Sequence, residues 1–464
     1  MGIANSYDDK LHEECGVYGI YCTEPETRVG TMTYYGLYAL QHRGQESCGI
    51  VTSDCQKMNS HKGMGLVSDV FSEQILQNMK GKSAIGHVRY ATAGEISMKN
   101  AQPVVGSCKL GEVAIAHNGT LINTSVIREL LEDCGSIFQT SVDSEVILNL
   151  ISRSAKKGIE SAVIDAMQAI KGSYALTILT NNELIGIRDP NGIRPLCLGK
   201  FENGYVLASE SCALDCTGAT YVRDVQPGEI VIINDDGIKS INFVEKSKRA
   251  VCSFEYVYFA RPDSIMDGVS VNKARLLSGK KLFEESPVEA DIVIGVPDSG
   301  VPAAIGYSRA SGIPFEMGLI KNRYVGRTFI APTQELRERA VTVKLNALKE
   351  VVNGKRIVLI DDSIVRGTTG KRLIDTLKNA GAKEVHLRIA SPVVKYPCYF
   401  GIDTPNRSEL IGANMEIDKI RETIGADSLA YISVEGLVEC IKENGGFCLG
   451  CFNGVYPMSA PKNE

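Results

Sequence analysis

The sequence lacks the features of membrane-bound, secreted and nucleic-acid-binding proteins. No run approaches the ~18 consecutive apolar residues of a transmembrane helix, and residues 1–14 contain no signal-peptide core. Tryptophan is absent. The 50 Lys and Arg nearly balance the 55 Asp and Glu, and a net charge of −5 does not indicate a general nucleic-acid binder. We therefore expect a cytoplasmic protein that binds neither membranes nor nucleic acid.

The chain is nevertheless long and contains many cysteines. Its 464 residues, 44% of them hydrophobic and 23% charged, indicate a globular protein of two or three domains. The 14 cysteines are scattered along the sequence. Because disulfides are rare in reducing cytosol, we expect mostly free thiols, many of them small buried apolar residues. Two positions stand apart: Cys15, beside a glycine near the start, and the C-x-x-C pair Cys448 and Cys451.

The first half of the sequence is rich in strand patterns. From Cys15 to about residue 245, short apolar runs such as GVYGIYC, GEVAIAHNG and SYALTILTNNELIGIRD are broken by Gly, Asn and Asp. Helical patterns cover 123–134 and 143–156. These features predict an α+β region of antiparallel sheets with packed helices.

After about residue 270 the pattern changes to strands that alternate with helices. DIVIGVP (291–297), RIVLIDD (356–362) and EVHLRIASP (384–392) are compact apolar strands. A helical stretch covers 370–382, with Gly381 as its expected stop. This alternation predicts a mainly parallel α/β sheet, in which ligands bind at the carboxyl ends of the strands.

The strongest local motif is RIVLIDDSIVRGTTG, residues 356–370. A buried strand ends at Asp361 and Asp362, and a Ser/Gly/Thr loop then leads into a helix. The N–H groups at a helix start suit a phosphate, while adjacent carboxylates suit sugar hydroxyls or Mg²⁺. An acidic pair before a Gly-rich turn also occurs at ordinary strand ends. The whole stretch, however, resembles the signature of type I phosphoribosyltransferases, which bind 5-phosphoribosyl-1-pyrophosphate.

This resemblance implies roles for residues in several segments. Asp361 and Asp362 would bind the ribose hydroxyls and Mg²⁺, and loop 363–369 the 5′-phosphate. In GVPDSGVPAA, residues 295–304, the same family binds pyrophosphate and metal. The implied phosphoribosyl pyrophosphate site comprises Asp298, Ser299, Gly300, Lys321, Arg323, Arg327, Asp361, Asp362, Ser363, Arg366, Gly367, Thr368 and Thr369, with Ser299, Asp361 and Asp362 at one Mg²⁺.

Residues 321–349 carry seven Lys or Arg against two Glu, although the whole chain is acidic. A charged run is usually a solvated face. Arginines in a Gly- and Pro-interrupted stretch can also form a lid that clamps a polyanion and excludes water. The family resemblance favours the lid.

The N-terminal half contains a second set of motifs, beginning with CGVYGI at Cys15. Any one of them alone would be an ordinary turn. Their joint order closely resembles the N-terminal-nucleophile, or class II, glutamine amidotransferase domain. The further motifs are LQHRGQESCGI (40–50), GHVRYATAG (86–94), AHNGTLIN (116–123) and SVDSEVIL (141–148).

In that family a processed N-terminus makes the nucleophile the first residue. A free α-amine has a reference pKa of about 7.7–8.0 and can act as a base. Cleavage after Glu14 would make Cys15 both the nucleophile and, through its amine, the base. By composition alone, residues 1–14 would be an ordinary disordered tail; the resemblance identifies them as a propeptide.

The resemblance also implies how glutamine is held. Arg89 would bind the α-carboxylate, Asp143 the α-ammonium group, and Thr92 would add a hydrogen bond. The Asn118 side chain and the Gly119 N–H would form the oxyanion hole. His117 is left with a structural role, because the terminal amine serves as base in this family.

The Cys448/Cys451 pair alone fits a zinc half-site, a redox pair or coincidence. A [4Fe–4S] cluster needs four thiolates, and spacing does not favour Cys252 and Cys398 over Cys440 or the Cys212/Cys216 pair. One branch of the glutamine phosphoribosylpyrophosphate amidotransferases resembles this layout. It implies one structural [4Fe–4S] cluster per subunit, on Cys252, Cys398, Cys448 and Cys451. Zinc in the same four cysteines is the alternative.

The resemblance to this iron–sulfur, propeptide-processed branch extends from Cys15 to Cys451. It implies a pentosyl transfer in which glutamine, phosphoribosyl pyrophosphate and water give phosphoribosylamine, pyrophosphate and glutamate, the first committed step of de novo purine synthesis. A homotetramer inhibited by purine nucleotides is also implied. We expect a propeptide at 1–14, a glutamine amidotransferase domain at 15–245 and a phosphoribosyltransferase domain with the cluster segment at 246–464.

Two other functions share part of this sequence pattern. A hexosamine-forming glutamine amidotransferase would share the first half but carry sugar-isomerase domains in place of VLIDDSIVRGTTG. A non-enzymatic nucleotide sensor with the phosphoribosyltransferase fold would carry a basic DNA-binding module. The sequence contains neither.

Overall fold

The strand patterns of the first half form two antiparallel sheets. The computed structural model describes residues 15–26, 28–90, 97–322, 345–404, 406–442 and 445–459. The first sheet has the order β11-β9-β10-β1-β4-β2-β3. Its strands are β1 (Gly16–Glu26), β2 (Ser47–Ser53), β3 (Met58–Met64), β4 (Gly81–Arg89), β9 (Cys197–Phe201), β10 (Gly204–Ala208) and β11 (Thr220–Asp224).

The second sheet has the order β13-β12-β8-β7-β6-β5. Asn181 and Asn182, which break the apolar run SYALTILTNNELIGIRD, lie in the turn between two of its strands. The strands are β5 (Val104–Cys108), β6 (Gly111–Leu121), β7 (Gly172–Thr180), β8 (Leu184–Arg188), β12 (Glu229–Asn234) and β13 (Gly237–Asn242).

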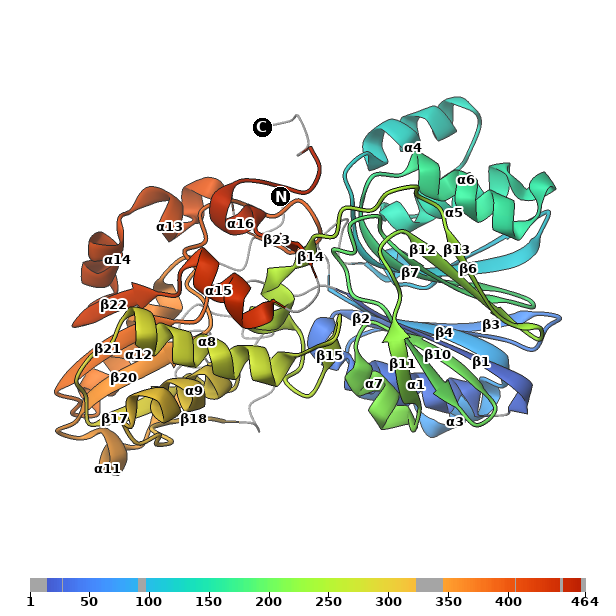
Figure 1. The fold of residues 1–464 in the computed structure, drawn as a ribbon. Helices are drawn as coiled ribbons and strands as arrows, with labels where there is room; N and C mark the ends of the chain where they lie inside the picture. Colours follow the sequence, from blue (N-terminus) through green and yellow to red (C-terminus); the bar gives the residue numbers. More distant parts are fainter. Residues whose placement is uncertain are drawn as a thin grey trace.

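These sheets stack face to face between helices (Figure 1). Val17 and Ile85 of the first sheet share an apolar core with Ala114 and Leu179 of the second. Beside the first sheet lie α1 (Val29–Ala39), α2 (Val67–Val70), α3 (Glu73–Asn78) and α7 (Ser211–Thr217), and over the second lie α4 (Thr124–Asp133), α5 (Asp143–Arg153) and α6 (Ile159–Ala169). The helix predicted over 143–156 thus ends at Arg153, before a short 3₁₀ turn.

The second half forms a parallel sheet with the order β17-β20-β21-β22. Its strands are β17 (Ile292–Gly295), β20 (Arg356–Asp361), β21 (Glu384–Ile389) and β22 (Ser428–Tyr431). The helices around it are α8 (Val271–Glu285), α9 (Val301–Ser311), α11 (Lys349–Val352), α12 (Thr368–Asn379), α13 (Ile411–Asn414), α14 (Ile417–Ile424) and α15 (Val434–Ile441). Gly381 follows α12 with a φ of +99°, which confirms the predicted stop.

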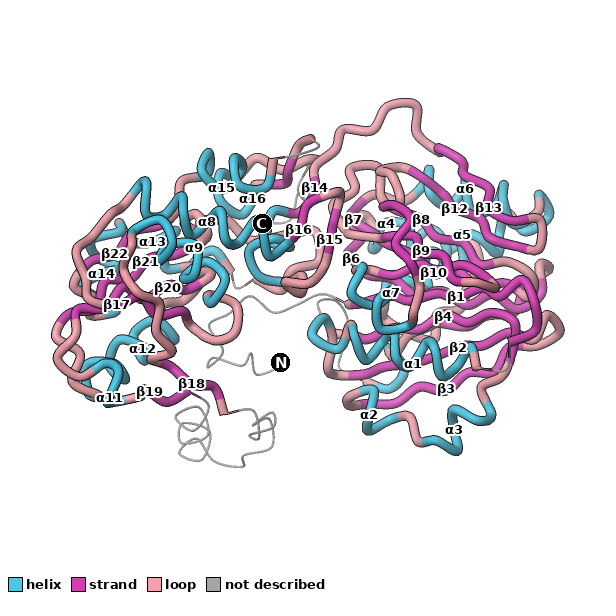
Figure 2. Tube along the Cα trace, turned by 60° about the horizontal axis from the view of Figure 1, so that its bottom comes forward, coloured by secondary structure: helices cyan, strands magenta, loops and turns pink. Residues whose placement is uncertain are grey.

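Short elements lie between the two halves (Figure 2). They comprise β14 (Val251–Cys252), which pairs in parallel with β23 (Phe447–Cys448), the hairpin β15 (Ile265–Met266) and β16 (Val269–Ser270), a π-helical turn at Glu255–Phe259 and α16 (Gly450–Asn453). A further hairpin, β18 (Leu319–Lys321) with β19 (Leu345–Ala347), flanks the parallel sheet.

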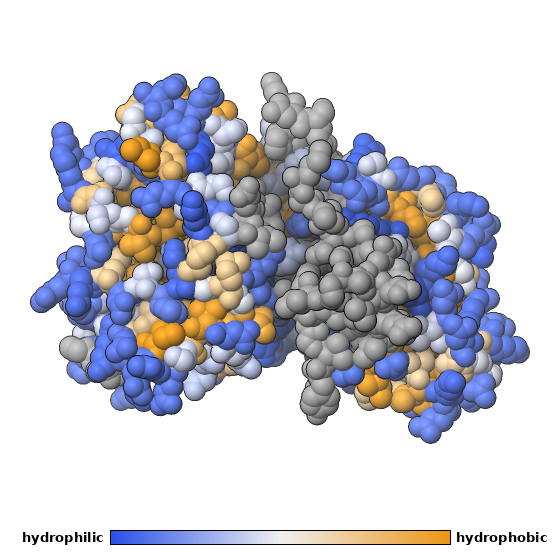
Figure 3. Space-filling view, turned by 180° about the vertical axis from the view of Figure 1, so that it is seen from behind, coloured by the Kyte–Doolittle hydropathy of each residue, from blue (hydrophilic) through white to orange (hydrophobic). Residues whose placement is uncertain are grey.

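The described surface is mixed in character. Figure 3 shows apolar residues in separate patches among polar ones on one face. Across the residues that the structure describes, no helix has the length and apolar character needed to cross a membrane.

Candidate functional site

Cys15 lies immediately before β1, in the interior of the first sheet. Gly16 pairs with Val88 across the antiparallel ladder, which brings Cys15 to Arg89 at the end of β4. The Cys15 thiol is buried and donates to the Tyr90 carbonyl at 3.5 Å. Burial raises the pKa of this thiol to about 11, and the nearby charge of Arg89 only partly offsets that effect. The thiol therefore needs a base to become a nucleophile at neutral pH.

Strand β6 carries His117, Asn118 and Gly119 and lies against β4, where His87 Nε2 is 2.9 Å from the His117 carbonyl oxygen. The Asn118 side chain is fully buried, and neither its Oδ1 nor its Nδ2 has a hydrogen-bond partner in the part of the chain that the structure describes. Buried polar groups are normally satisfied, so an amide in this state is poised for a ligand. Gly119 has a φ of +136°, and a Cβ there would lie 2.2 Å from the Ser173 carbonyl oxygen. Only glycine fits at that position.

Asp143, in the first turn of α5, is held in place by two donors. His117 Nδ1 contacts one carboxylate oxygen at 3.1 Å, and the Leu121 N–H donates to the other at 3.1 Å. Burial would raise the pKa of Asp143, but the His117 imidazole and the N–H groups of Leu121 and Ser144 outweigh it and lower the pKa. The carboxylate thus stays charged, as a partner for an ammonium group must. The structural role predicted for His117 is to orient Asp143.

The acidic pair of the phosphoribosyl motif ends β20, as the sequence predicted. Asp361 and Asp362 are buried, and the Asp362 N–H donates to Asp361 Oδ1 at 2.9 Å. Asp362 also accepts hydrogen bonds from the hydroxyls of Ser363, at 2.6 Å, and Ser299. Ser299 follows β17, the parallel neighbour of β20, so both loops meet at the carboxyl edge of the sheet. Carboxylate and hydroxyl oxygens converge there, and these are ligands suited to Mg²⁺.

The phosphate loop runs from this acidic pair into α12. Gly367 caps the helix with a φ of +86°, and Thr368 and Thr369 form its first turn. Their N–H groups lie at the positive end of the helix dipole, a suitable place for a phosphate. The Arg366 guanidinium contacts Glu409 at 2.9 Å.

The remaining predicted ligands divide between described and undescribed segments. Lys321 Nζ lies 3.1 Å from Asp298 Oδ2, so the start of the basic stretch reaches the pyrophosphate loop. Gly300 caps α9 directly after Ser299. Thr92, Arg323, Arg327 and the leader 1–14 lie outside the described residues.

The four cysteines assigned to a cluster come together from three segments. Cys252 and Cys448 are paired across β14 and β23. The Cys451 carbonyl accepts hydrogen bonds from the N–H groups of Lys395 and Tyr396, which bring the loop of Cys398 alongside. Burial raises the pKa of Cys448 to about 11, with Cys398 adding to that rise. Cys212 lies instead in the core of the first sheet, and Cys216 is exposed.

These cysteines supply thiolates, which are ligands of the kind that iron–sulfur clusters and zinc use. All 14 cysteines are free, as expected, but those without a proposed role are not uniformly buried, since Cys134 and Cys216 are exposed. Across the described residues, no group of three or more His, Cys, Asp or Glu side chains is arranged to hold a metal ion. Thiols with raised pKa values would need a bound cation to ionise.

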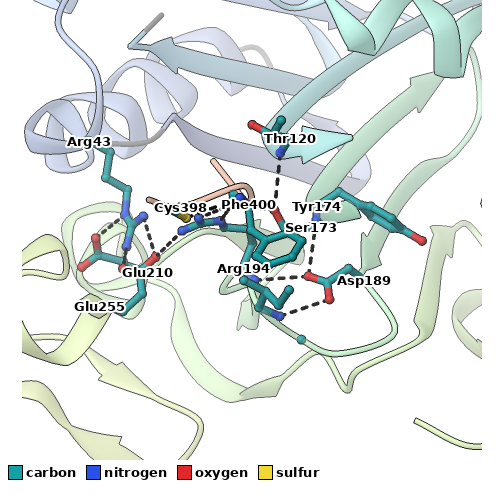
Figure 4. Close-up of polar contacts among 12 residues, drawn as sticks. Arg43, Thr120, Ser173, Tyr174, Asp189, Arg194, Glu210, Glu255, Cys398 and Phe400 are labelled. Carbon is teal, nitrogen blue, oxygen red and sulfur yellow. Dashed lines mark hydrogen bonds and ion pairs between the residues drawn. The ribbon is translucent and has the colours of Figure 1, made fainter. Parts of the chain in front are cut away.

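Sequence reasoning did not identify the contacts behind β6 at Asn118 and Gly119. Ser173, on β7 beside Gly119, donates its hydroxyl to the Phe400 carbonyl at 2.7 Å (Figure 4). The Arg194 Nε–H donates to the same oxygen at 2.9 Å. These partners are more than 200 positions apart, and no local motif marks them.

The chain matches known families in both halves and as a whole. Residues 87–216 match a glutamine amidotransferase domain, and residues 271–392 a phosphoribosyl transferase domain. The amidophosphoribosyltransferase of Bacillus subtilis is 52% identical over 96% of this chain and 94% of its own length. That of Archaeoglobus fulgidus is 51% identical over 97% of this chain and 99% of its own length.

A solved structure agrees with these sequence matches. Glutamine phosphoribosylpyrophosphate amidotransferase from B. subtilis, complexed with ADP and GMP, has a TM-score of 0.91 at 51% identity. The match covers 97% of this chain and 98% of that one. The glutaminase-like and phosphoribosyl-binding geometries thus occur together in full-length relatives. The chain belongs to the amidophosphoribosyltransferase family of glutamine-dependent enzymes.

Proposed function

We propose that the chain releases ammonia from glutamine at Cys15 and transfers it to C1 of phosphoribosyl pyrophosphate at the loops after β17 and β20. The products are phosphoribosylamine, pyrophosphate and glutamate, the first committed step of de novo purine synthesis. Residues 15–245 carry the first half-reaction, and residues 246–464 carry the second.

The observation that carries this proposal is the unpartnered amide of Asn118. This buried side chain precedes Gly119, which has no side chain to cover its backbone N–H. Together the Asn118 Nδ2 and Gly119 N–H supply donors for a tetrahedral oxyanion. Buried amides are normally hydrogen-bonded at both ends, so the absence of partners for Asn118 among the described residues supports a ligand site here.

The first half-reaction follows from this geometry. After removal of residues 1–14, the Cys15 α-amine takes the thiol proton and the sulfur attacks the glutamine amide carbon. The C–N bond breaks, ammonia leaves with that proton, and water then hydrolyses the γ-glutamyl thioester to glutamate. Arg89 holds the substrate α-carboxylate, Asp143 holds the α-ammonium group, and Thr92 adds a hydrogen bond.

In the second half-reaction, the C1–O bond to pyrophosphate breaks as the nitrogen lone pair of ammonia forms the C1–N bond. Asp361 and Asp362 orient the ribose, and Ser363, Arg366, Gly367, Thr368 and Thr369 hold the 5′-phosphate. Asp298, Ser299 and Gly300 hold the pyrophosphate with Lys321, Arg323 and Arg327. Mg²⁺ at Ser299, Asp361 and Asp362 would neutralise charge on the leaving group.

Ammonia must pass between the two sites without protonation in bulk water. We infer a closed, water-poor passage that forms when segment 321–349, of which residues 323–344 lie outside the described part of the chain, closes on the sugar phosphate. The same closure would activate Cys15. Equal glutaminase activity with and without phosphoribosyl pyrophosphate would contradict this coupling.

The cysteine group is best explained by a structural [4Fe–4S] cluster on Cys252, Cys398, Cys448 and Cys451. The convergence of three segments on these thiols supports it. Iron and acid-labile sulfide should be found in anaerobically purified protein, at about four of each per subunit. Zinc in their place would contradict the assignment.

Regulation and assembly extend the proposal. Purine nucleotides are the expected feedback inhibitors, supported by the ADP and GMP bound in the B. subtilis relative. We also propose a cytoplasmic homotetramer.

The decisive experiment measures pyrophosphate release from phosphoribosyl pyrophosphate with glutamine or with ammonia as the nitrogen donor. Cys15→Ala should abolish the glutamine-dependent reaction and keep the ammonia-dependent one. Retention of the glutamine-dependent reaction would overturn the assignment of Cys15. Loss of both reactions in a folded variant would overturn the division between two sites.

A further inference from the structure

A backbone carbonyl of the second half is held by two side chains of the first. The Phe400 oxygen accepts from Ser173 Oγ at 2.7 Å and from Arg194 Nε at 2.9 Å, with Arg194 Nη2 as a further donor (Figure 4). Ser173, Arg194 and Phe400 are all almost completely buried. Hydrogen bonds from a charged donor in a buried setting are strong, so this junction is firmly fixed.

The same junction reaches the proposed oxyanion hole. Ser173 Oγ also accepts from the Thr120 N–H at 3.4 Å, and Ser173 and Thr120 are paired across β7 and β6. Gly401, which follows Phe400 in loop 398–401, has a φ of +103°. A Cβ on Gly401 would lie 3.2 Å from Gly119 Cα and 3.3 Å from Gly119 C. Loop 398–401 therefore packs directly on the backbone of Gly119.

The donors are themselves anchored. Asp189 accepts from the N–H groups of Tyr174 and Arg194, at 3.3 and 3.2 Å. Arg194 Nη1 lies 3.6 Å from Glu255 Oε1, and Glu255 also binds the buried Arg43. Figure 4 shows this series of contacts extending from Arg43 to Thr120. The donors to the Phe400 carbonyl thus belong to a buried network of hydrogen bonds and ion pairs, and none of them lies on the surface.

We propose that Ser173 and Arg194 are positioning residues of the glutaminase half-reaction. By holding the Phe400 carbonyl, these two side chains keep loop 398–401 packed against Gly119. This packing fixes the direction of the Gly119 N–H. This rests on the proposed function, in which Gly119 donates to the oxyanion. The oxyanion forms only in the transition state, so misplacing the donor lowers kcat and leaves KM for glutamine nearly unchanged.

The test compares Ser173→Ala with Thr177→Val in the full-length mature enzyme. Thr177 lies on the same strand, is fully buried, and its hydroxyl has no partner among the described residues, so its loss should leave the activity unchanged. For Ser173→Ala we expect kcat for glutamine hydrolysis to fall about tenfold, with KM changing less than about twofold. Ammonia-dependent synthesis should not change.

A binding measurement gives a second readout. The Cys15 thiol adds across the aldehyde of glutamate γ-semialdehyde, in which CHO replaces the side-chain amide of glutamine, to give a hemithioacetal whose oxygen occupies the oxyanion position. Ser173→Ala should bind this aldehyde about tenfold more weakly, yet bind glutamate as the wild type does. A purely structural defect would weaken both.

If Ser173→Ala does not fold, Arg194→Lys replaces it in the same measurements. Lysine keeps the positive charge but cannot donate from both Nε and Nη2 to the Phe400 carbonyl as Arg194 does. Asn118→Ala separates the two proposals. If Asn118→Ala lowers kcat while Ser173→Ala and Arg194→Lys do not, the positioning role is wrong and the oxyanion assignment stands. If Asn118→Ala leaves kcat unchanged, the oxyanion assignment itself fails.

Discussion

The two reaction centres of this chain are built in opposite ways. The proposed glutaminase groups lie within or directly beside antiparallel strands, where Asn118 and Gly119 are fixed by pairing with β7 on one side and by loop 398–401 on the other. The proposed phosphoribosyl-binding groups lie in loops after parallel strands, where Asp362 is held by short contacts to Ser299 and Ser363. The first site depends on long-range packing, while the second is made largely by local sequence.

The largest expected difference between the two centres concerns Asp362. Asp362→Asn removes charge at the proposed sugar and metal site, so ammonia-dependent synthesis should fall about 10³-fold. Hydrolysis of glutamine alone should remain close to that of the wild type. Parallel assays with the exposed Asp375→Asn on α12 provide the control. An equal loss of both activities, with glutamine hydrolysis assayed without phosphoribosyl pyrophosphate, would show that Asp362 does not act at the second centre alone.

Asn118→Ala should have the reverse effect. Removing one oxyanion donor lowers kcat for glutamine by about 10²-fold, while ammonia-dependent synthesis stays intact. Steady-state kinetics with each nitrogen donor measures the split. A variant that loses ammonia-dependent synthesis to the same degree would contradict the separation of the two sites.

Acid should act on the glutaminase region through His87, a fully buried residue of β4. Burial lowers the pKa of His87 to about 3, which the hydrogen bond to the His117 carbonyl only partly opposes. Between pH 6.5 and 3 the His87 imidazole is protonated in the unfolded chain but largely neutral in the folded protein. The free energy of unfolding therefore falls as pH falls through that window. The expected loss is about 2 kcal/mol at pH 5.

Unfolding experiments at several pH values measure this effect. His87→Gln should flatten the pH dependence between pH 6.5 and 4, whereas His61→Gln on β3, which is not fully buried, should not. An unchanged slope for His87→Gln would show that His87 is not the group responsible.

The smallest effect is expected at His117. His117→Ala removes the donor to Asp143 Oδ1, so KM for glutamine should rise about tenfold with less change in kcat. His117→Asn places an amide nitrogen near the former Nδ1 and should restore part of the affinity. A fall in kcat with an unchanged KM would instead indicate a direct role in the chemistry.

Much of the fold could be predicted from local patterns. The strand expected at 356–362 is β20 (Arg356–Asp361), and the helix expected at 370–382 is α12 (Thr368–Asn379), which begins two residues earlier. Continuous apolar runs and a glycine at a helix end are local signals, so the elements that they predict form in the folded chain. The helix predicted at 143–156 ends early because the backbone leaves the α-helix at Ser154 and continues as a 3₁₀ turn over Ala155–Lys157.

The site was predictable in part for the same reason. Asp361, Asp362 and loop 363–369 are contiguous, so one motif identifies them. A structural role for His117 was predicted, but its partner was not, because Asp143 lies 26 positions away on a different element. The grouping of Cys252 with Cys448 needed family resemblance, since spacing alone did not distinguish them from Cys440.

The sequence by itself determined the two domain types through the order of their motifs, and the acidic strand end at Asp361 and Asp362 because these residues are contiguous. It also predicts Cys15 as the nucleophile. Only the tertiary structure decided what supports them. The contact of Phe400 with Ser173 and Arg194 joins segments more than 200 positions apart. A backbone carbonyl looks the same at every position in a sequence, so only the packing of the two halves could select the Phe400 carbonyl as the acceptor beside Gly119.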